Sequence, residues 1–183
     1  MQTWADAERL VSSLAAACEP DRIPVPDAEA LLTTVSSMEA RLWAVKARLA
    51  ARVAEAGGWR TSGTRTPAEE LARRTRVSIG EARRLLDTGA RLETQPEIAA
   101  AAAAGALSSG QVVLVSDAAA AAPEETAALL ATATDSETSF ASLREACLAA
   151  KAGADPDPEA THRRIHAGRG LRFWTDGEGA GNF

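Results

Sequence analysis

TPAEELARRTRVSIGEARRLLDTGAR, residues 66–91, is the stretch that decides the fold, because it predicts two capped helices joined by a tight turn. Thr66 is followed by Pro67 and Glu69, which supply a threonine N-cap, a proline in the first helical turn and a capping-box carboxylate. Ser78 and Glu81 repeat the capping-box spacing. We therefore expect a short helix, a turn and a second helix, in a helix-turn-helix-like pair.

The second helix of the pair has an apolar and a basic side in the sequence pattern. Arg84, Thr88 and Arg91 fall roughly opposite the apolar residues, so the exposed face is expected to be basic. The expected core face consists of Ile79, Ala82, Leu86 and Ala90.

Positive charge is concentrated around this pair, although the whole chain of 183 residues has a formal net charge of -5. Residues 41–91 hold 12 basic against 5 acidic residues, whereas residues 92–160 hold 2 against 11. Binding to a polyanion depends on local potential rather than on the total charge. Apart from Lys46 and Lys151 the cations are arginine, which suits bidentate contacts to phosphate or guanine.

The composition predicts a mainly α fold, a multi-helix bundle with one long helix. Hydrophobic residues make up 46% of the chain but aromatic residues only 4%, so the core is expected to consist mostly of Leu, Val and Ala. We divide the chain into an N-terminal helix with a Pro-containing linker (1–26), a helical core domain (27–152), and a linker with a basic helix and a truncated β segment (153–183). The last segment, LRFWTDGEGAGNF, predicts the start of a short β-hairpin.

One long helix is predicted from Asp27 to about Ala56, ended by Gly57 and Gly58. Its apolar residues alternate spacings of four and three, the pattern of a helix seam. Two interpretations remain open: a core stripe of the bundle, or the seam of a homodimer. The stripe consists of Leu31, Val35, Met38, Leu42, Val45 and Leu49.

Further helices follow with their own start and stop signals. Gly105 follows an alanine run as a C′ residue, and Ser108 with Gln111 forms another capping box. Leu107 and Val112 are spaced for a hydrophobic staple around that cap.

Three segments resemble the actinobacterial domain of unknown function 222. They are ARRTRVSIGEARRLLDTGARLETQPEIAAAAAAGALSSGQVVLVSDA (72–118), LREACLAAKAGADPD (143–157) and RGLRFWTDGEG (169–179), and the resemblance covers roughly residues 30–178. Its most specific part is the spacing from Ser78, Glu81-Ala82 and Leu85-Leu86 to Pro96, Gly105, Leu107-Ser108 and Gln111.

The resemblance implies association with DNA and with a metal-dependent HNH endonuclease module downstream. An HNH site requires a histidine base or metal ligands, and no histidine follows His166. We therefore expect no catalysis by this chain alone, no catalytic residue and no cofactor.

The two histidines, His162 and His166, are spaced to share one face of a basic helix, ATHRRIHAGRG. Arginines crowd that helix, so we predict a solvated or phosphate-facing surface and no metal site. Cys18 and Cys147 have no metal-ligand spacing and are expected to be reduced thiols. No secretion signal or membrane span is expected, which predicts a cytoplasmic protein.

The leading hypothesis is a helical DNA-binding module of an HNH nuclease-associated protein. Glu69–Arg73, Glu70–Arg74 and Arg83–Asp87 are expected to form ion pairs along their helices. The alternative is a protein-interaction or homodimerisation module, whose basic helix pair meets an acidic protein surface. The candidate nucleic-acid-binding residues are Arg73, Arg74, Arg76, Arg84, Arg91, Arg163 and Arg164, of which Arg76, Arg84 and Arg91 are favoured because no carboxylate is spaced to pair with them.

Overall fold

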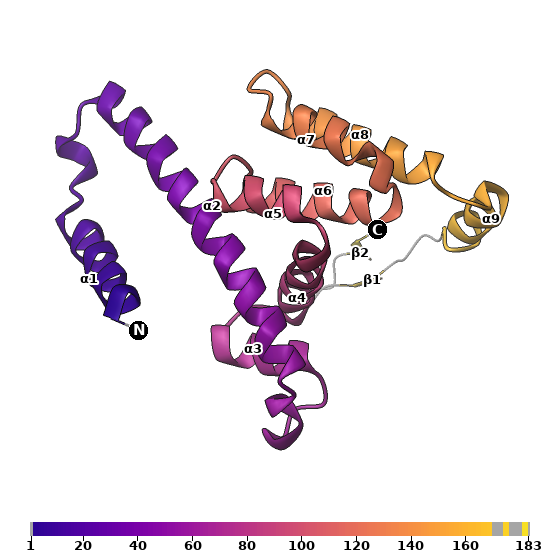
Figure 1. Ribbon diagram of the computed structural model, residues 1–183, viewed down its shortest axis with the longest axis horizontal. Coiled ribbons are helices and arrows are strands. Elements are labelled where there is room, and N and C mark those ends of the chain that lie inside the picture. Colours follow the sequence, from indigo (N-terminus) through magenta and orange to yellow (C-terminus); the bar gives the residue numbers. More distant parts are fainter. Residues whose placement is uncertain (1, 170–173, 176–180, 183) are drawn as a thin grey trace. The chain divides into compact units, whose positions relative to one another are not determined.

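The computed structural model describes residues 2–169, 174–175 and 181–182, and its fold is mainly α, as predicted (Figure 1). Short 3-10 turns (η) and α-helices follow one another along the chain. In order they are α1 Gln2–Ala17, η1 Pro20–Arg22, α2 Val25–Glu55, η2 Gly58–Thr61, α3 Pro67–Thr75, α4 Ile79–Thr94, α5 Pro96–Ala103, α6 Ser109–Ala121, η3 Pro123–Glu125, α7 Thr126–Thr134, α8 Phe140–Gly153 and α9 Pro158–Ala167.

The predicted hairpin start falls mostly on residues outside the described ones. The described residues of this segment form two stretches of two residues each, β1 Trp174–Thr175 and β2 Gly181–Asn182, which pair antiparallel. Residues 176–180, where a hairpin turn would lie, are not among the described residues. The hairpin therefore stays a prediction.

The chain divides into two compact units, Met1–Val112 and Val113–Phe183. The boundary falls within α6. The domain limits at residues 26 and 152 expected from the sequence are not tested by this division and stay predictions.

Local capping starts the helices where the sequence predicts. The Thr66 hydroxyl accepts a hydrogen bond from the Glu69 amide, and the Ser78 hydroxyl accepts one from the Glu81 amide, both at 3.1 Å. Ser108 and Gln111 form the reciprocal capping box, since the Gln111 carboxamide oxygen also accepts from the Ser108 amide at 2.8 Å. Helix α5 begins differently, because its N-cap is Gln95 and makes no side-chain capping bond.

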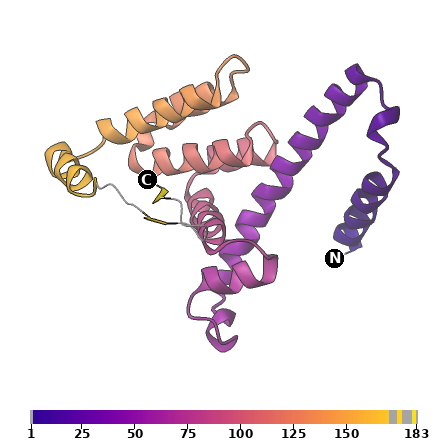
Figure 2. The ribbon, with the colours of Figure 1, turned by 180° about the vertical axis from the view of Figure 1, so that it is seen from behind.

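Long helix α2 packs on α4 and α5 through a face made of alanine (Figures 1 and 2). Gly89 of α4 lies against this face so closely that a Cβ built there would overlap the carbonyl oxygen of Ala47 and lie 3.1 Å from the Ala51 Cβ. Only small side chains allow two helix backbones to approach in this way. The buried residues of α2 are Ala40, Ala44, Ala47, Ala50 and Ala51.

The alternation of leucine and valine on α2 is not the core of this unit, so that interpretation of the stripe is wrong. Leu31, Val35, Leu42 and Leu49 are each at least 50% exposed. At 3.6 residues per turn the stripe lies roughly opposite the buried alanines. The closer approach that alanine permits against Gly89 decides which face turns inward, and the larger side chains are left outside.

The core face of α4 also differs from the predicted one. Ile79 is 45% exposed and Ala90 is exposed, whereas Thr88, expected on the basic side, is fully buried. The inward face is rotated toward α2 because Gly89 provides the close contact. The buried residues of α4 are Ala82, Leu85, Thr88, Gly89 and Leu92.

Thr88 gives a prediction for stability, because its Oγ1 is buried and has no hydrogen-bond partner among the described residues. Replacing Thr88 with the nearly isosteric valine removes an unsatisfied polar group, so the free energy of unfolding should rise by about 1 kcal/mol. Urea unfolding followed by circular dichroism measures it. Thr33→Val, at an exposed hydroxyl bonded to the Glu29 carbonyl, is the control and should change little. A less stable Thr88→Val protein would contradict the prediction.

The end of α5 is held against α2 by polar contacts. Gly105 adopts the left-handed conformation (φ 70°) expected of a C′ glycine, and a Cβ there would lie 2.8 Å from the Ser37 Oγ. Arg41 donates from Nε and Nη2 to the Ala104 carbonyl at 3.1 and 2.9 Å. These bonds satisfy a carbonyl that the helix end leaves open.

In the second unit, α7 packs on α8 with Leu129, Leu143 and Cys147 buried. Lys151 donates to the Asp117 carboxylate at 2.6 Å. Among the helices of the described residues, none combines the length and apolar character needed to cross a membrane.

Candidate nucleic-acid interface

Helices α3 and α4 form the predicted pair, joined by Arg76, Val77 and Ser78. Arg76 closes α3 in the left-handed conformation, with φ 57° and ψ 38°. It is the one non-glycine residue with positive φ in the described part of the chain. Glycine takes this conformation at almost no cost, whereas another residue is strained by about 1–2 kcal/mol. An exposed arginine at a turn that favours glycine is the kind of outlier that suggests a functional role.

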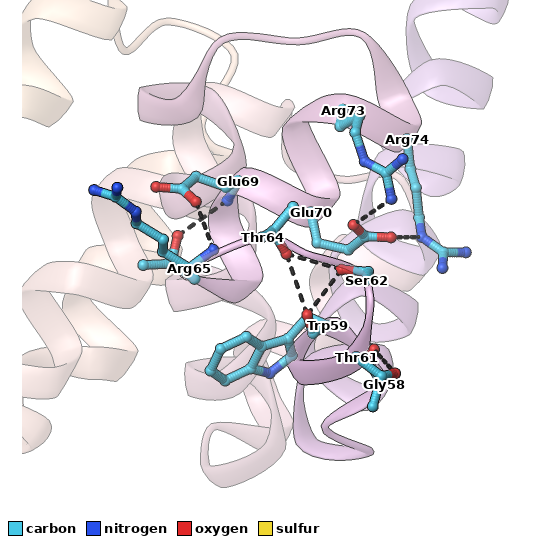
Figure 3. Close-up of polar contacts among 11 residues, drawn as sticks. Gly58, Trp59, Thr61, Ser62, Thr64, Arg65, Glu69, Glu70, Arg73 and Arg74 are labelled. Atoms are coloured by element: carbon cyan, nitrogen blue, oxygen red, sulfur yellow. Dashed lines mark hydrogen bonds and ion pairs between the residues drawn. The ribbon is translucent and has the colours of Figure 1, made fainter.

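A buried carboxylate holds the arginines at the end of α3 (Figure 3). Glu70 is 3% exposed and accepts from Arg73 Nη2 at 2.6 Å and from Arg74 Nε at 2.5 Å. Both arginine side chains remain 63% exposed. The carboxylate therefore fixes two guanidinium groups at the surface, with donors left over for a further acceptor.

This clamp lowers the pKa of Glu70 from 4.5 to about 2, chiefly through the hydrogen bond from Arg73 and then that from Arg74. Because the carboxyl binds its proton more weakly in the folded state, it contributes stability above pH 4.5 that is lost as the pH falls toward 2. Glu70→Gln should lower the urea midpoint at pH 7, and its difference from the parent should shrink on acidification. Glu93→Gln, exposed on α4, controls for loss of a carboxylate. A difference constant with pH would contradict the clamp.

Two exposed arginines, Arg60 and Arg65, lie just before the helix pair. They were not among the candidate residues predicted from the sequence, because the predicted motif began at Thr66. Arg60 lies over the Trp59 ring, with its Cζ 4.8 Å from the ring centroid. The Arg65 amide donates to the Glu69 carboxylate at 2.8 Å, so this residue directly precedes the α3 cap (Figure 3). The signal was present, because both arginines lie in the loop GWRTSGTRT that leads into α3.

That loop is fixed by its own hydrogen bonds. The Trp59 carbonyl accepts from the Ser62 hydroxyl at 2.8 Å and from the Thr64 hydroxyl at 3.3 Å, and the two hydroxyls lie 2.9 Å apart (Figure 3). The Trp59 indole donates to the Ala54 carbonyl near the end of α2 at 3.2 Å. These bonds attach the loop to α2.

The two arginines predicted on α4 as nucleic-acid contacts, Arg84 and Arg91, differ in exposure. Arg84 is exposed, and its Nε donates to the Gly80 carbonyl of its own helix at 3.3 Å. Arg91 is partly buried and already takes part in an interaction within the protein. Arg83 is exposed one turn from Asp87, but no ion pair joins these two described residues. The predicted Arg83–Asp87 pair is therefore wrong, and Arg83 joins the candidate residues.

The ion pair expected between Glu69 and Arg73 is also replaced, because Arg73 binds Glu70 and the Glu69 carboxylate accepts from the Arg65 amide. The pair Glu70–Arg74 is confirmed. The sequence spacing allowed Arg73 to pair with either Glu69 or Glu70. In the structure the buried Glu70 carboxylate pairs with both Arg73 and Arg74.

Arg163 and Arg164 lie on α9 in the second unit, where both are exposed. The rings of His162 and His166 face one side of that helix, with centroids 6.4 Å apart. Within the described residues, no group of three or more His, Cys, Asp and Glu side chains comes together around them or elsewhere.

A small hollow lies beside the Glu70 clamp, lined mainly by apolar residues that include Val53, Trp59 and Leu71. Its volume is about 50 Å³, far below the roughly 300–1,000 Å³ of a typical small-molecule site. The hollow is therefore too small for a typical small-molecule ligand. The exposed arginines of this unit suit phosphate oxygens as acceptors.

A comparison with known protein families shows which family model the chain matches. The family described as a domain of unknown function, DUF222, matches residues 29–181, which includes α2 from residue 29 onward and all of α3 to α9. Searches of curated proteins and of solved structures found no match. Since the family match covers most of the chain, this protein belongs to the DUF222 family.

Proposed function

We propose that this chain is a DNA-binding helical module in which α3, its turn and the start of α4 meet the phosphate backbone. The observation that carries the proposal is the set of exposed arginines that lie in the loop before α3, on α3, in the turn and at the start of α4. They are Arg60, Arg65, Arg73, Arg74, Arg76, Arg83 and Arg84. All lie between residues 60 and 84 of one compact unit, and such a concentration of like charge raises the local positive potential.

The clamp supports binding because it restrains two of these side chains before a ligand arrives. A free arginine loses rotamer entropy when it binds phosphate, and restraint by Glu70 reduces that loss. Phosphate contacts supply affinity without reading sequence, so this proposal concerns backbone binding. Arg91 has a weaker claim than the sequence suggested, because it is partly buried and engaged.

The resemblance described above adds the proposal that the module positions an HNH endonuclease domain on DNA. We assign no catalytic step to the present chain. Arg163 and Arg164 on α9 are proposed as secondary phosphate contacts, since both are exposed on a helix that carries two further ionisable imidazoles.

The test is a titration of fluorescent duplex DNA with the full chain at several salt concentrations. Binding through phosphates releases counterions, so log K should fall linearly with log salt, with a slope of about −0.9 for each phosphate contacted. Absence of binding at low salt, or an affinity that does not change with salt, would overturn the proposal.

A second candidate is a self-association module, favoured by the apolar stripe that α2 leaves exposed. The two candidates are compatible, because the stripe and the α4-binding face lie on opposite sides of α2. A third candidate, in which the arginines meet an acidic protein surface, would give no binding to the duplex but salt-dependent binding to a labelled acidic protein titrated in parallel.

A further inference from the structure

Helix α2 carries two apolar faces, and only one of them is buried against other helices of the described residues. The inner alanine face packs on α4 and α5. The outer stripe leaves Leu31 50%, Val35 57%, Leu42 50% and Leu49 56% exposed, with Met38 and Val45 partly buried between them. A contiguous apolar stripe exposed on a protein surface commonly marks an interaction site. The outer stripe is therefore a candidate surface for a partner.

We propose that this occupant is a second copy of the chain, whose α2 packs antiparallel on the stripe around a two-fold axis near residue 40. The proposal rests on self-association, the second candidate function, and specifies its geometry. The regular alternation of four and three residues is the spacing at which one helix packs along another over a seam. An identical helix supplies the same spacing without any further partner.

The spacing of the stripe reads the same in both directions, so an antiparallel pair fills every layer. Its layers place Leu31 opposite Leu49, Val35 opposite Val45, and Met38 opposite Leu42 of the second copy. The seam is about 27 Å long at 1.5 Å per residue. A parallel pair also fills its layers, so the flanking charges must decide the direction.

The flanking charges favour the antiparallel direction. Glu39 and Lys46 are exposed on one flank of the stripe, each one residue after a seam residue, and Arg41 lies on the other flank. An antiparallel pair brings like flanks together, so Lys46 of each copy meets Glu39 of the other. A parallel pair brings unlike flanks together, so Lys46 then lies away from Glu39 and these two contacts are absent.

Arg41 does not oppose the antiparallel pair strongly, although the axis brings the two copies of this residue near each other. Its guanidinium turns away to the Ala104 carbonyl at the end of α5. The partial negative charge at the C-terminal end of α5 offsets the positive charge of the Arg41 guanidinium. The favourable contacts of Glu39 with Lys46 therefore remain.

Thiol cross-linking of the full chain tests the direction. Cys18 is exposed and is first replaced by serine, whereas Cys147 is buried and stays. Leu31→Cys, Leu49→Cys and the double variant are treated with a short bis-maleimide at concentrations where light scattering reports a dimer. The antiparallel pair predicts covalent dimers from the double variant only. Cross-linking of either single variant would show a parallel pair, and a monomeric mass for the parent protein would remove the dimer altogether; either result overturns the proposal.

Charge reversal gives an independent check. Lys46→Glu should weaken the dimer about tenfold, because two attractive contacts with Glu39 become repulsive. The double variant Glu39→Lys with Lys46→Glu should restore it. An unchanged or tighter dimer of Lys46→Glu would contradict the antiparallel pair.

DNA binding separates this proposal from the proposed function. The Lys46→Glu protein is titrated with the same duplex beside the parent at a concentration where both are monomeric. Equal affinity is expected, because α3 and α4 lie on the other side of α2. A Lys46→Glu protein that dimerises less but binds DNA as tightly as the parent confirms that the seam is separate from the DNA surface. An equal loss of dimerisation and of DNA affinity would contradict it.

Discussion

Gly89→Ala should lower the free energy of unfolding by about 2 kcal/mol or more, the largest stability effect that we expect from one methyl group. The added Cβ would overlap the Ala47 carbonyl oxygen and lie 2.8 Å from the carbonyl carbon, so the backbones of α2 and α4 would have to separate. A backbone cannot rotate aside as a flexible side chain can. The gain of about 1 kcal/mol in helix propensity does not offset this cost.

Gly80→Ala is the matched control for that prediction. Gly80 lies in the same helix, and a Cβ built there meets no atom within 4 Å. It should therefore raise the free energy of unfolding by about 0.5–1 kcal/mol. Urea unfolding of the two variants measures both changes, and they should have opposite signs. A Gly89→Ala protein as stable as the parent would show that α2 and α4 do not cross so closely.

The triple variant Arg76→Gly, Arg83→Ala, Arg84→Ala should weaken binding to duplex DNA on the order of 10- to 100-fold at moderate salt. The salt slope should also become shallower by about 0.9 for each phosphate that the variant no longer binds. These residues are exposed, and no carboxylate among the described residues pairs with any of them. Arg73 and Arg74 are avoided, because their removal leaves the buried Glu70 carboxylate without its two positively charged partners.

Glycine is used at position 76 because it fits the left-handed conformation and should leave the turn intact or more stable. The control is the triple variant Arg9→Ala, Arg22→Ala, Arg144→Ala, which changes the net charge equally at other exposed positions. It should leave affinity close to that of the parent. Equal losses of affinity in both triple variants would indicate that overall charge attracts the DNA. No loss in either variant would show that DNA does not bind at Arg76, Arg83 and Arg84.

The family motif has a structural explanation in the caps. Ser78 starts α4, Ser108 and Gln111 start α6, and Gly105 ends α5 in the left-handed conformation. These residues also form the most specific part of the resemblance that the sequence suggested. They fix where helices begin and end, so the resemblance reports a shared fold more directly than a shared binding site.

The candidate site was only partly predictable. The sequence identified the helix pair and most of its arginines, but it assigned Arg73 to the wrong glutamate and paired Arg83 with a carboxylate that it does not meet. Both errors concern which of the neighbouring carboxylates is buried or within reach, and helical spacing alone does not decide this. The conformation of Arg76 was equally hidden, since nothing local distinguishes an arginine at a strained helix end.

The sequence by itself determined the class of the fold and the positions of its helix ends, because a cap such as Thr66 acts through bonds to residues three or four positions away. The tertiary structure alone decided which face of each helix is buried. On α2 the alanines turn inward and the larger Leu and Val side chains remain outside, since Gly89 admits only a small face. That choice depends on a residue about forty positions along the chain, and local periodicity carries no information about it.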